Sequence, residues 1–95
     1  MTQTKPQLIQ DLNAFGEQAF RKGEYAQAEE RFRTALEVYK EWFKESGYGH
    51  VEVLSSITGL VRALEAQGRR SDAGQMLEDE HSTVIGVIRM LKEKL

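Results

Sequence analysis

The 95-residue sequence contains no cysteine, and this absence excludes several kinds of chemistry. Without thiols the chain can form no disulfide, no thiolate nucleophile and no zinc site with cysteine ligands. Long apolar runs are also missing. No stretch approaches the roughly 20 apolar residues of a membrane-spanning helix, and the first ten residues lack the apolar run of a secretory signal. We therefore expect a cytoplasmic protein that has no membrane partner.

An excess of positive charge is missing as well. The 13 Lys and Arg residues are set against 15 Asp and Glu residues, which leaves a net charge of −2. Nucleic-acid binding depends largely on clustered cations that contact phosphates. The one small basic cluster consists of Arg69 and Arg70 with Arg62 nearby. We therefore expect no nucleic-acid partner.

Strand signals are absent, and helical periodicity takes their place. The single proline, Pro6, falls in the first turn of a helix, between Thr4 and Gln7, which fit a capping box. Apolar residues then recur at helical spacing in segments separated by glycine-containing turns. The pattern predicts an all-α fold of four helices, at about 5–22, 24–45, 50–67 and 71–95, with Ser71 as the N-cap of the last.

Each predicted helix has a stripe of apolar or small residues that we expect to form the core. The stripes are Leu8, Leu12, Phe15, Gly16 and Ala19; Ala28, Phe32, Ala35, Tyr39 and Trp42; Leu54, Ile57, Val61 and Leu64; and Leu77, His81, Val84, Ile88, Leu91 and Leu95. Gly74 and Gly86 lie inside the last helix. Each should lower its stability by about 1 kcal/mol relative to alanine.

The two halves of the chain align with each other after a shift of 45 residues. Core positions then fall on core positions: Leu12 on Ile57, Gly23 on Gly68, Ala28 on Ala73 and Phe32 on Leu77. A period of this length is typical of helical repeat arrays. We therefore expect a single domain over residues 1–95, with a first repeat at about 5–46 and a second at about 50–94.

The order of residues in the first half is distinctive. It reads Leu12, Phe15-Gly16, Ala19, Gly23-x-Tyr25, Ala28, Phe32 and Ala35. This order resembles the tetratricopeptide repeat family, and the resemblance extends over about residues 8–92. The second half departs from the pattern at Val61 and Glu80, and Lys40 stands where the family has a proline. Because the period exceeds the usual repeat of about 34 residues, the chain is similar to long-helix versions such as kinesin light chain repeats.

The resemblance implies a four-helix α-α superhelix segment that binds another protein or a peptide segment. Small residues at Gly16 and Ala28 suit a close crossing of two antiparallel helices, with Phe32 beside it. The expected concave groove has these candidate residues: Asn13, Glu17, Phe20, Arg21, Ser55, Thr58, Arg62 and Glu65. Asn13 and Glu17 occupy the places of the Lys and Asn with which some members hold a carboxylate. An acid there repels a carboxylate, so we predict no carboxylate clamp.

A second candidate surface lies on the last predicted helix. Beside its stripe it carries Met76, Ile85, Val87 and Met90, which have no neighbour that the pattern can identify. Repeat arrays usually need about three repeats and a polar cap, and an exposed apolar strip indicates an interface. We expect this strip to bind a partner or a second copy in a homodimer. Two alternatives are that the four helices bury it, or that the chain is a structural subunit completing a larger solenoid.

The search for catalytic or metal-binding patterns yields one partial motif. Glu78-x-x-His81 is half of the motif that binds two iron ions in four-helix bundles, but Gly47 stands where a matching glutamate would precede His50. No Gly-x-Ser-x-Gly turn or phosphate-binding glycine loop is present. We therefore expect no metal, no cofactor and no enzymatic activity.

Overall fold

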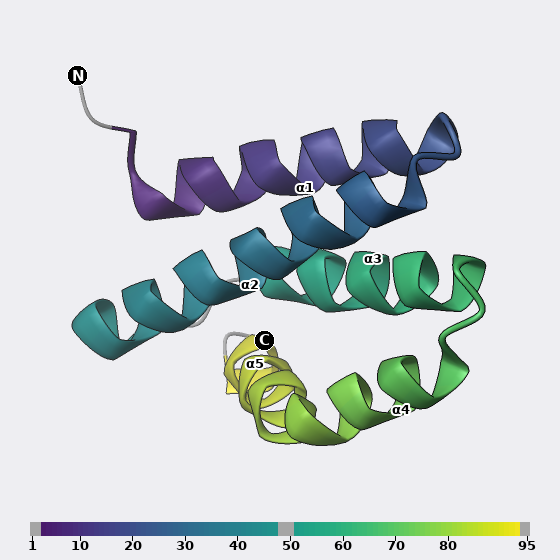
Figure 1. Cartoon of the computed structure of the whole chain (residues 1–95). Helices are drawn as coiled ribbons and strands as arrows, with labels where there is room; N and C mark the ends of the chain where they lie inside the picture. The colour runs from purple at the N-terminus through teal and green to yellow at the C-terminus, as the bar shows by residue number, and fades with distance from the viewer. Residues whose placement is uncertain (1–2, 48–50, 94–95) are drawn as a thin grey trace.

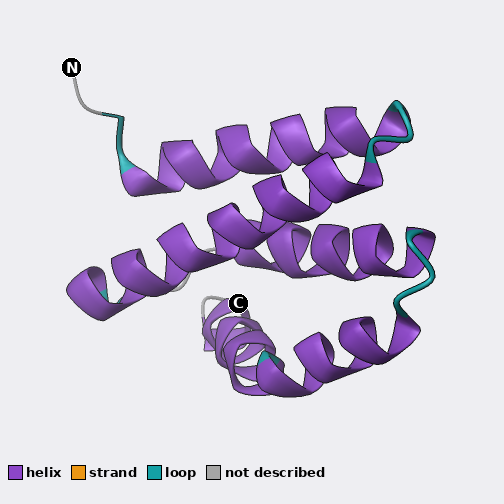
Figure 2. Cartoon of the chain, in the orientation of Figure 1, coloured by secondary structure: helices purple, strands orange, loops and turns teal. Residues whose placement is uncertain are grey.

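The structure is a computed structural model that describes residues 3–47 and 51–93. Within these residues the regular secondary structure is all helix and no strand is present, which confirms the all-α prediction (Figure 2). The helices are α1 (Lys5–Arg21), α2 (Tyr25–Ser46), α3 (Glu52–Ala66), α4 (Arg70–Asp79) and α5 (His81–Glu93). None of them is long and apolar enough to cross a membrane.

The first two helices form an antiparallel hairpin (Figure 1). The Thr4 hydroxyl accepts a hydrogen bond from the Gln7 backbone N–H at 3.3 Å, which confirms the predicted N-cap of α1. Gly23 follows α1 with a φ of +79°, a left-handed conformation that costs glycine little. Its counterpart Gly68 has a φ of +78° after α3, so the two glycines predicted to end these helices adopt the same left-handed conformation in the turns that follow α1 and α3.

The aromatic ring of Phe32 joins the first three helices. This α2 side chain is 2% exposed and lies against Gly16 of α1 and Gly59 of α3. An added Cβ at Gly16 would come within 2.9 Å of the ring, and one at Gly59 would come closer still. Glycine at both positions therefore allows the helix backbones to enclose the ring. The predicted contact of Gly16 with Phe32 is confirmed, whereas the role of Gly59 was not predicted.

Most of the predicted stripes of the first three helices are buried, with one clear exception. Phe15 is 54% exposed, so its prediction as a core residue is wrong. The buried line of α1 instead follows Ile9, Leu12, Gly16 and Ala19. Phe15 projects about 100° away from Gly16 around the helix, and this rotation places its ring in solvent.

The predicted fourth helix is also wrong in two respects. It begins at Arg70 after Arg69, so Ser71 lies inside the first turn and is not the N-cap. It also ends at Asp79, and α5 then starts at His81 in a different direction (Figure 1). The prediction for the start of the third helix at His50 lies outside the described residues, and α3 begins at Glu52.

Glu80 forms the joint between α4 and α5. It is 5% exposed although it is acidic, and its carboxylate accepts hydrogen bonds from Lys40 on α2 and from the Thr83 hydroxyl, the latter at 3.2 Å. A buried carboxylate is tolerated when such partners replace water. The contact with Lys40 thus ties the joint to α2, and neither a proline nor a glycine lies at the change of direction.

The joint rotates the face that α5 presents to the rest of the fold. Val87 is 3% exposed, whereas Leu77, Ile88 and Leu91 are 47%, 38% and 43% exposed. The stripe predicted as the core of one continuous helix is therefore wrong at these three positions and at His81, which is exposed. A straight helix would have kept one face in register along its length, and the break at Glu80 ends that register before Ile88 and Leu91. Leu77 precedes the break, and the buried residues of α4 are Ala73 and Met76.

Candidate functional site

An open groove with a volume of about 570 Å³ runs between α1 and α3. We name it the α1/α3 groove, and its lining comprises Gln10, Asn13, Ala14, Glu17, Phe32, Glu52, Leu54, Ser55, Thr58, Gly59 and Arg62. Five of the eight predicted groove residues line it: Asn13, Glu17, Ser55, Thr58 and Arg62. The two helices are separated in sequence by all of α2, and α3 packs beside α1 to complete the groove.

Asn13 anchors one wall of this groove. It is 7% exposed, and its Nδ2 donates to the Glu52 carbonyl oxygen at 3.0 Å. The hydroxyl of Ser56, which is fully buried, donates to Asn13 Oδ1 at 2.7 Å. Buried amides must be satisfied in this way. Asn13 therefore fixes α1 against α3 and offers a partner little further hydrogen-bonding capacity, while Ser56 is a structural residue that the sequence patterns did not identify.

An ion pair connects the two walls of the groove. Arg62 Nη1 lies 3.4 Å from Glu17 Oε2, and the Arg62 guanidinium lies 4.4 Å above the centre of the Phe20 ring. Phe20 in turn packs edge-on against Tyr25 with ring centres 5.2 Å apart. Stacking of Arg62 on an aromatic face holds the cation in place. The acid predicted at Glu17 is therefore paired within the fold.

The three remaining predicted residues lie outside the lining. Phe20 supports Arg62 as described, and Arg21 is exposed with its Nε 3.7 Å from Glu17 Oε1. Glu65 is also exposed but does not line the groove. Gln10, Ser55 and Thr58 are exposed in the groove and can donate and accept hydrogen bonds, and the Arg62 side chain is 46% exposed there.

The apolar strip predicted on the last helix does not form a continuous surface. Met76 and Val87 are 8% and 3% exposed and belong to the core, so their prediction as interface residues is wrong. Ile85 is 37% exposed, and Met90 is half-buried. Met76 lies on α4 and the other three residues lie on α5, where Ile85 and Val87 are about 200° apart around the helix, so the four residues share no face.

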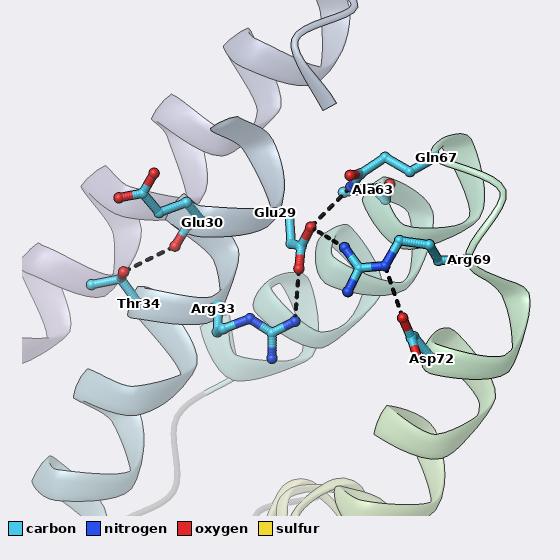
Figure 3. A network of polar contacts seen from close by, with 8 residues as sticks. All are labelled: Glu29, Glu30, Arg33, Thr34, Ala63, Gln67, Arg69 and Asp72. Carbon is cyan, nitrogen blue, oxygen red and sulfur yellow. Dashed lines mark hydrogen bonds and ion pairs between the residues drawn. The ribbon is translucent and has the colours of Figure 1, made fainter. Parts of the chain in front are cut away.

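A polar network links α2 to the turn between α3 and α4 (Figure 3). Glu29 accepts hydrogen bonds from Gln67 at 3.0 Å, from Arg69 at 2.7 Å and from Arg33 at 2.9 Å. Burial opposes ionisation of Glu29, but the hydrogen bonds from Gln67 and Arg33 and the positive charges of Arg69 and Arg33 outweigh it and hold its pKa below the ordinary value. Arg69 also donates to Asp72 at 2.8 Å, and this bond leads the causes that raise the pKa of Arg69.

This network is structural in character. Its members satisfy one another, and the Gln67 side chain also donates to the Ala63 carbonyl at 3.0 Å. Within residues 3–47 and 51–93, no three potential metal-ligating side chains gather in one place. His50, the partner sought for the Glu78-x-x-His81 motif, lies outside the described residues.

No protein-family model matches the chain, and neither a curated protein nor a solved structure is significantly similar to it.

Proposed function

We propose that this chain is a protein-interaction module of two helical repeats similar to tetratricopeptide repeats, and that the α1/α3 groove binds a segment of another protein. The observation that supports this proposal most directly is the convergence of Glu17, Ser55, Thr58 and Arg62 on one open groove. These residues come from helices that are distant in sequence, and the resemblance to the tetratricopeptide repeat family implies a common surface for them.

The chemistry of the groove suits a polypeptide in an extended form. Exposed hydroxyl and amide groups of Gln10, Ser55 and Thr58 line its sides, where a peptide backbone presents donors and acceptors at regular intervals. The apolar part of the lining includes the exposed Ala14 and the partly buried Leu54. Apolar side chains of the ligand would be buried there, while hydrogen bonds to Gln10, Ser55 and Thr58 would fix the position of the peptide along the groove.

A selection from a displayed peptide library tests this proposal. Peptides selected on the wild-type protein are re-measured on Thr58→Tyr and Ser55→Tyr, which fill the groove from exposed positions. Arg31→Tyr is the matched control, because Arg31 is also exposed on a helix and lies outside the groove. We expect binding to weaken at least about tenfold in both groove variants and to be unchanged in the control. Peptides that bind all four proteins equally would contradict the proposal.

A second candidate function is a structural one, in which the chain completes a homodimer or a larger solenoid and has no separate ligand. The exposure of Ile85, Ile88 and Leu91 on α5 favours it, because neighbouring apolar side chains on a surface are typical of an interface. Sedimentation analysis over a concentration series distinguishes the two candidates. The structural candidate requires an assembly that Ile88→Ser and Leu91→Ser dissociate together.

A further inference from the structure

A second groove lies between the C-terminal half of α2 and the face of α5 that carries Ser82, Gly86 and Met90. Its volume is about 600 Å³, and it shares no lining residue with the α1/α3 groove. The floor contains Tyr39 and Val87, each 3% exposed, and the walls include Phe43 and Met90. Phe43 stacks on Tyr39 with ring centres 6.0 Å apart, yet 44% of Phe43 remains exposed. We name this site the α2/α5 groove.

The shape of this groove suits a helix as ligand. One wall is formed by α5 at Gly86, where an added Cβ would meet no atom within 4 Å. The bare backbone at Gly86 lets another helix approach closely, as small residues do wherever helices cross. A volume of about 600 Å³ accommodates the row of large side chains that an amphipathic helix presents every three or four residues.

The charges around the groove select the kind of helix. Lys40 and Lys44 are the charged residues of the lining, which contains no carboxylate. Lys40 is held by Glu80, whereas Lys44 makes no ion pair with any residue in the described ranges 3–47 and 51–93. A cation at the edge of an apolar surface favours a ligand with acidic residues beside its apolar face.

From these features we infer that the α2/α5 groove binds an amphipathic helix of another protein whose apolar face is flanked by Asp or Glu. Its apolar side chains would cover Phe43 and Met90, and its acids would pair with Lys44. The inference concerns a site separate from the α1/α3 groove and does not depend on the function proposed for that groove.

A second copy of this chain is a poorer occupant on electrostatic grounds. The exposed apolar side chains of α5 at Ile85, Ile88 and Leu91 alternate with Arg89 and Lys92. Inserting this helix into the groove of a second copy would bring its cations toward Lys44. Like charges at close range repel, so the complementary partner is an acidic helix.

Fluorescence anisotropy with two labelled peptides of about 16 residues, long enough to form a helix, tests the inference. Both have leucine at helical spacing along one face. The first carries glutamate at the flanking positions, and the second carries lysine there. We expect the acidic peptide to bind at least about tenfold more tightly, and its affinity to fall as salt screens the charges.

Two pairs of variants locate the binding. Gly86→Phe fills the groove from an open position, and Gly74→Phe is its control, because an added Cβ at Gly74 also meets nothing within 4 Å but lies outside the lining. Lys44→Glu reverses the charge at the rim, and the exposed Lys22→Glu is its control. We expect the two groove variants to weaken acidic-peptide binding about tenfold or more and the controls to leave it unchanged.

Three results would overturn the inference. The first is equal binding of the two peptides, and the second is unchanged acidic-peptide binding by Lys44→Glu, which needs no change in the packing of α5. The third is a concentration-dependent dimer that Gly86→Phe dissociates, because this would show a second copy in the groove. The Thr58→Tyr variant separates the two sites, since filling the α1/α3 groove should leave acidic-peptide binding intact.

Discussion

Replacing Gly59 with alanine should destabilise the fold, although alanine is the better helix former. An added Cβ at Gly59 would lie closer to the Phe32 ring than the 2.9 Å expected at Gly16. Carbon atoms in good contact are about 3.5–4.0 Å apart, so the ring or the α3 backbone must move by about 1 Å. The ring is 2% exposed, and moving away from Gly59 presses it toward Gly16 on the other side.

The expected magnitude follows from two opposing terms. Overpacking a core typically costs about 1–3 kcal/mol, and the upper end applies at Gly59 because Phe32 is enclosed on both sides. Replacing glycine by alanine inside a helix returns about 1 kcal/mol. We expect a net loss of about 2 kcal/mol for Gly59→Ala and a smaller loss for Gly16→Ala. Gly74→Ala, where the new methyl group meets nothing, should gain about 1 kcal/mol.

Urea unfolding followed by circular dichroism and by Trp42 fluorescence measures these free energies. A further variant, Phe32→Leu, identifies the cause, because the shorter side chain removes the ring atoms that the new methyl group meets. Phe32→Leu should therefore destabilise the Gly59→Ala protein less than it destabilises the wild type, and the two losses of unfolding free energy should differ by at least about 0.5 kcal/mol. The reasoning is refuted if Gly59→Ala is as stable as Gly74→Ala, or if the two changes are additive.

Three further predictions concern single side chains. Glu29→Gln should destabilise the protein at neutral pH. The pKa of Glu29 is lower in the folded protein than its ordinary value of 4.5, so its stabilising contribution is present above pH 4.5 and is lost as the pH falls through the folded-state pKa. The difference in unfolding free energy between wild type and variant, measured in urea titrations, should therefore shrink on acidification. Val87→Ala should lower the unfolding free energy by about 1–2 kcal/mol because the Val87 side chain is 3% exposed. Ile88 is 38% exposed, so Ile88→Ala should change the free energy, measured by thermal unfolding, by less than about 0.5 kcal/mol. Equal losses in the two variants would contradict the observed orientation of α5. Lys40→Ala should lower the free energy of chemical unfolding by about 1–3 kcal/mol, because it removes a hydrogen-bond donor from the buried Glu80 carboxylate. An unchanged free energy would show that the contact with Lys40 does not stabilise the joint.

The first three helices could be predicted from local signals. Glycine at positions 23 and 68 marked the turns, and the period of apolar residues placed Leu12 and Phe32 in the core. The error at Phe15 was avoidable in principle, because the line through Ile9, Leu12 and Gly16 already defines a face from which Phe15 is rotated.

The break at Glu80 could not be predicted in the same way. The residues around it contain neither proline nor glycine, and helical spacing continues on both sides. At the break, Glu80 pairs with Lys40, which lies on another helix. Hydrophobic periodicity describes only positions along one helix, so it could predict neither this contact between helices nor the α2/α5 groove.

The position of Phe32 bears on how the molecule unfolds. The predicted repeats meet between α2 and α3, yet the glycines that enclose this ring lie on opposite sides of that predicted boundary. Separating the two halves would expose the Phe32 ring, which is 2% exposed in the fold, so α1, α2 and α3 should lose their structure in one cooperative step. In α5 only Val87 is buried among the described residues, so the amide protons of α5 should exchange with solvent through local fluctuations long before those of α3 do. We therefore expect α1, α2 and α3 to form one cooperative unit that crosses the predicted repeat boundary, with α5 as a separate unit of lower stability.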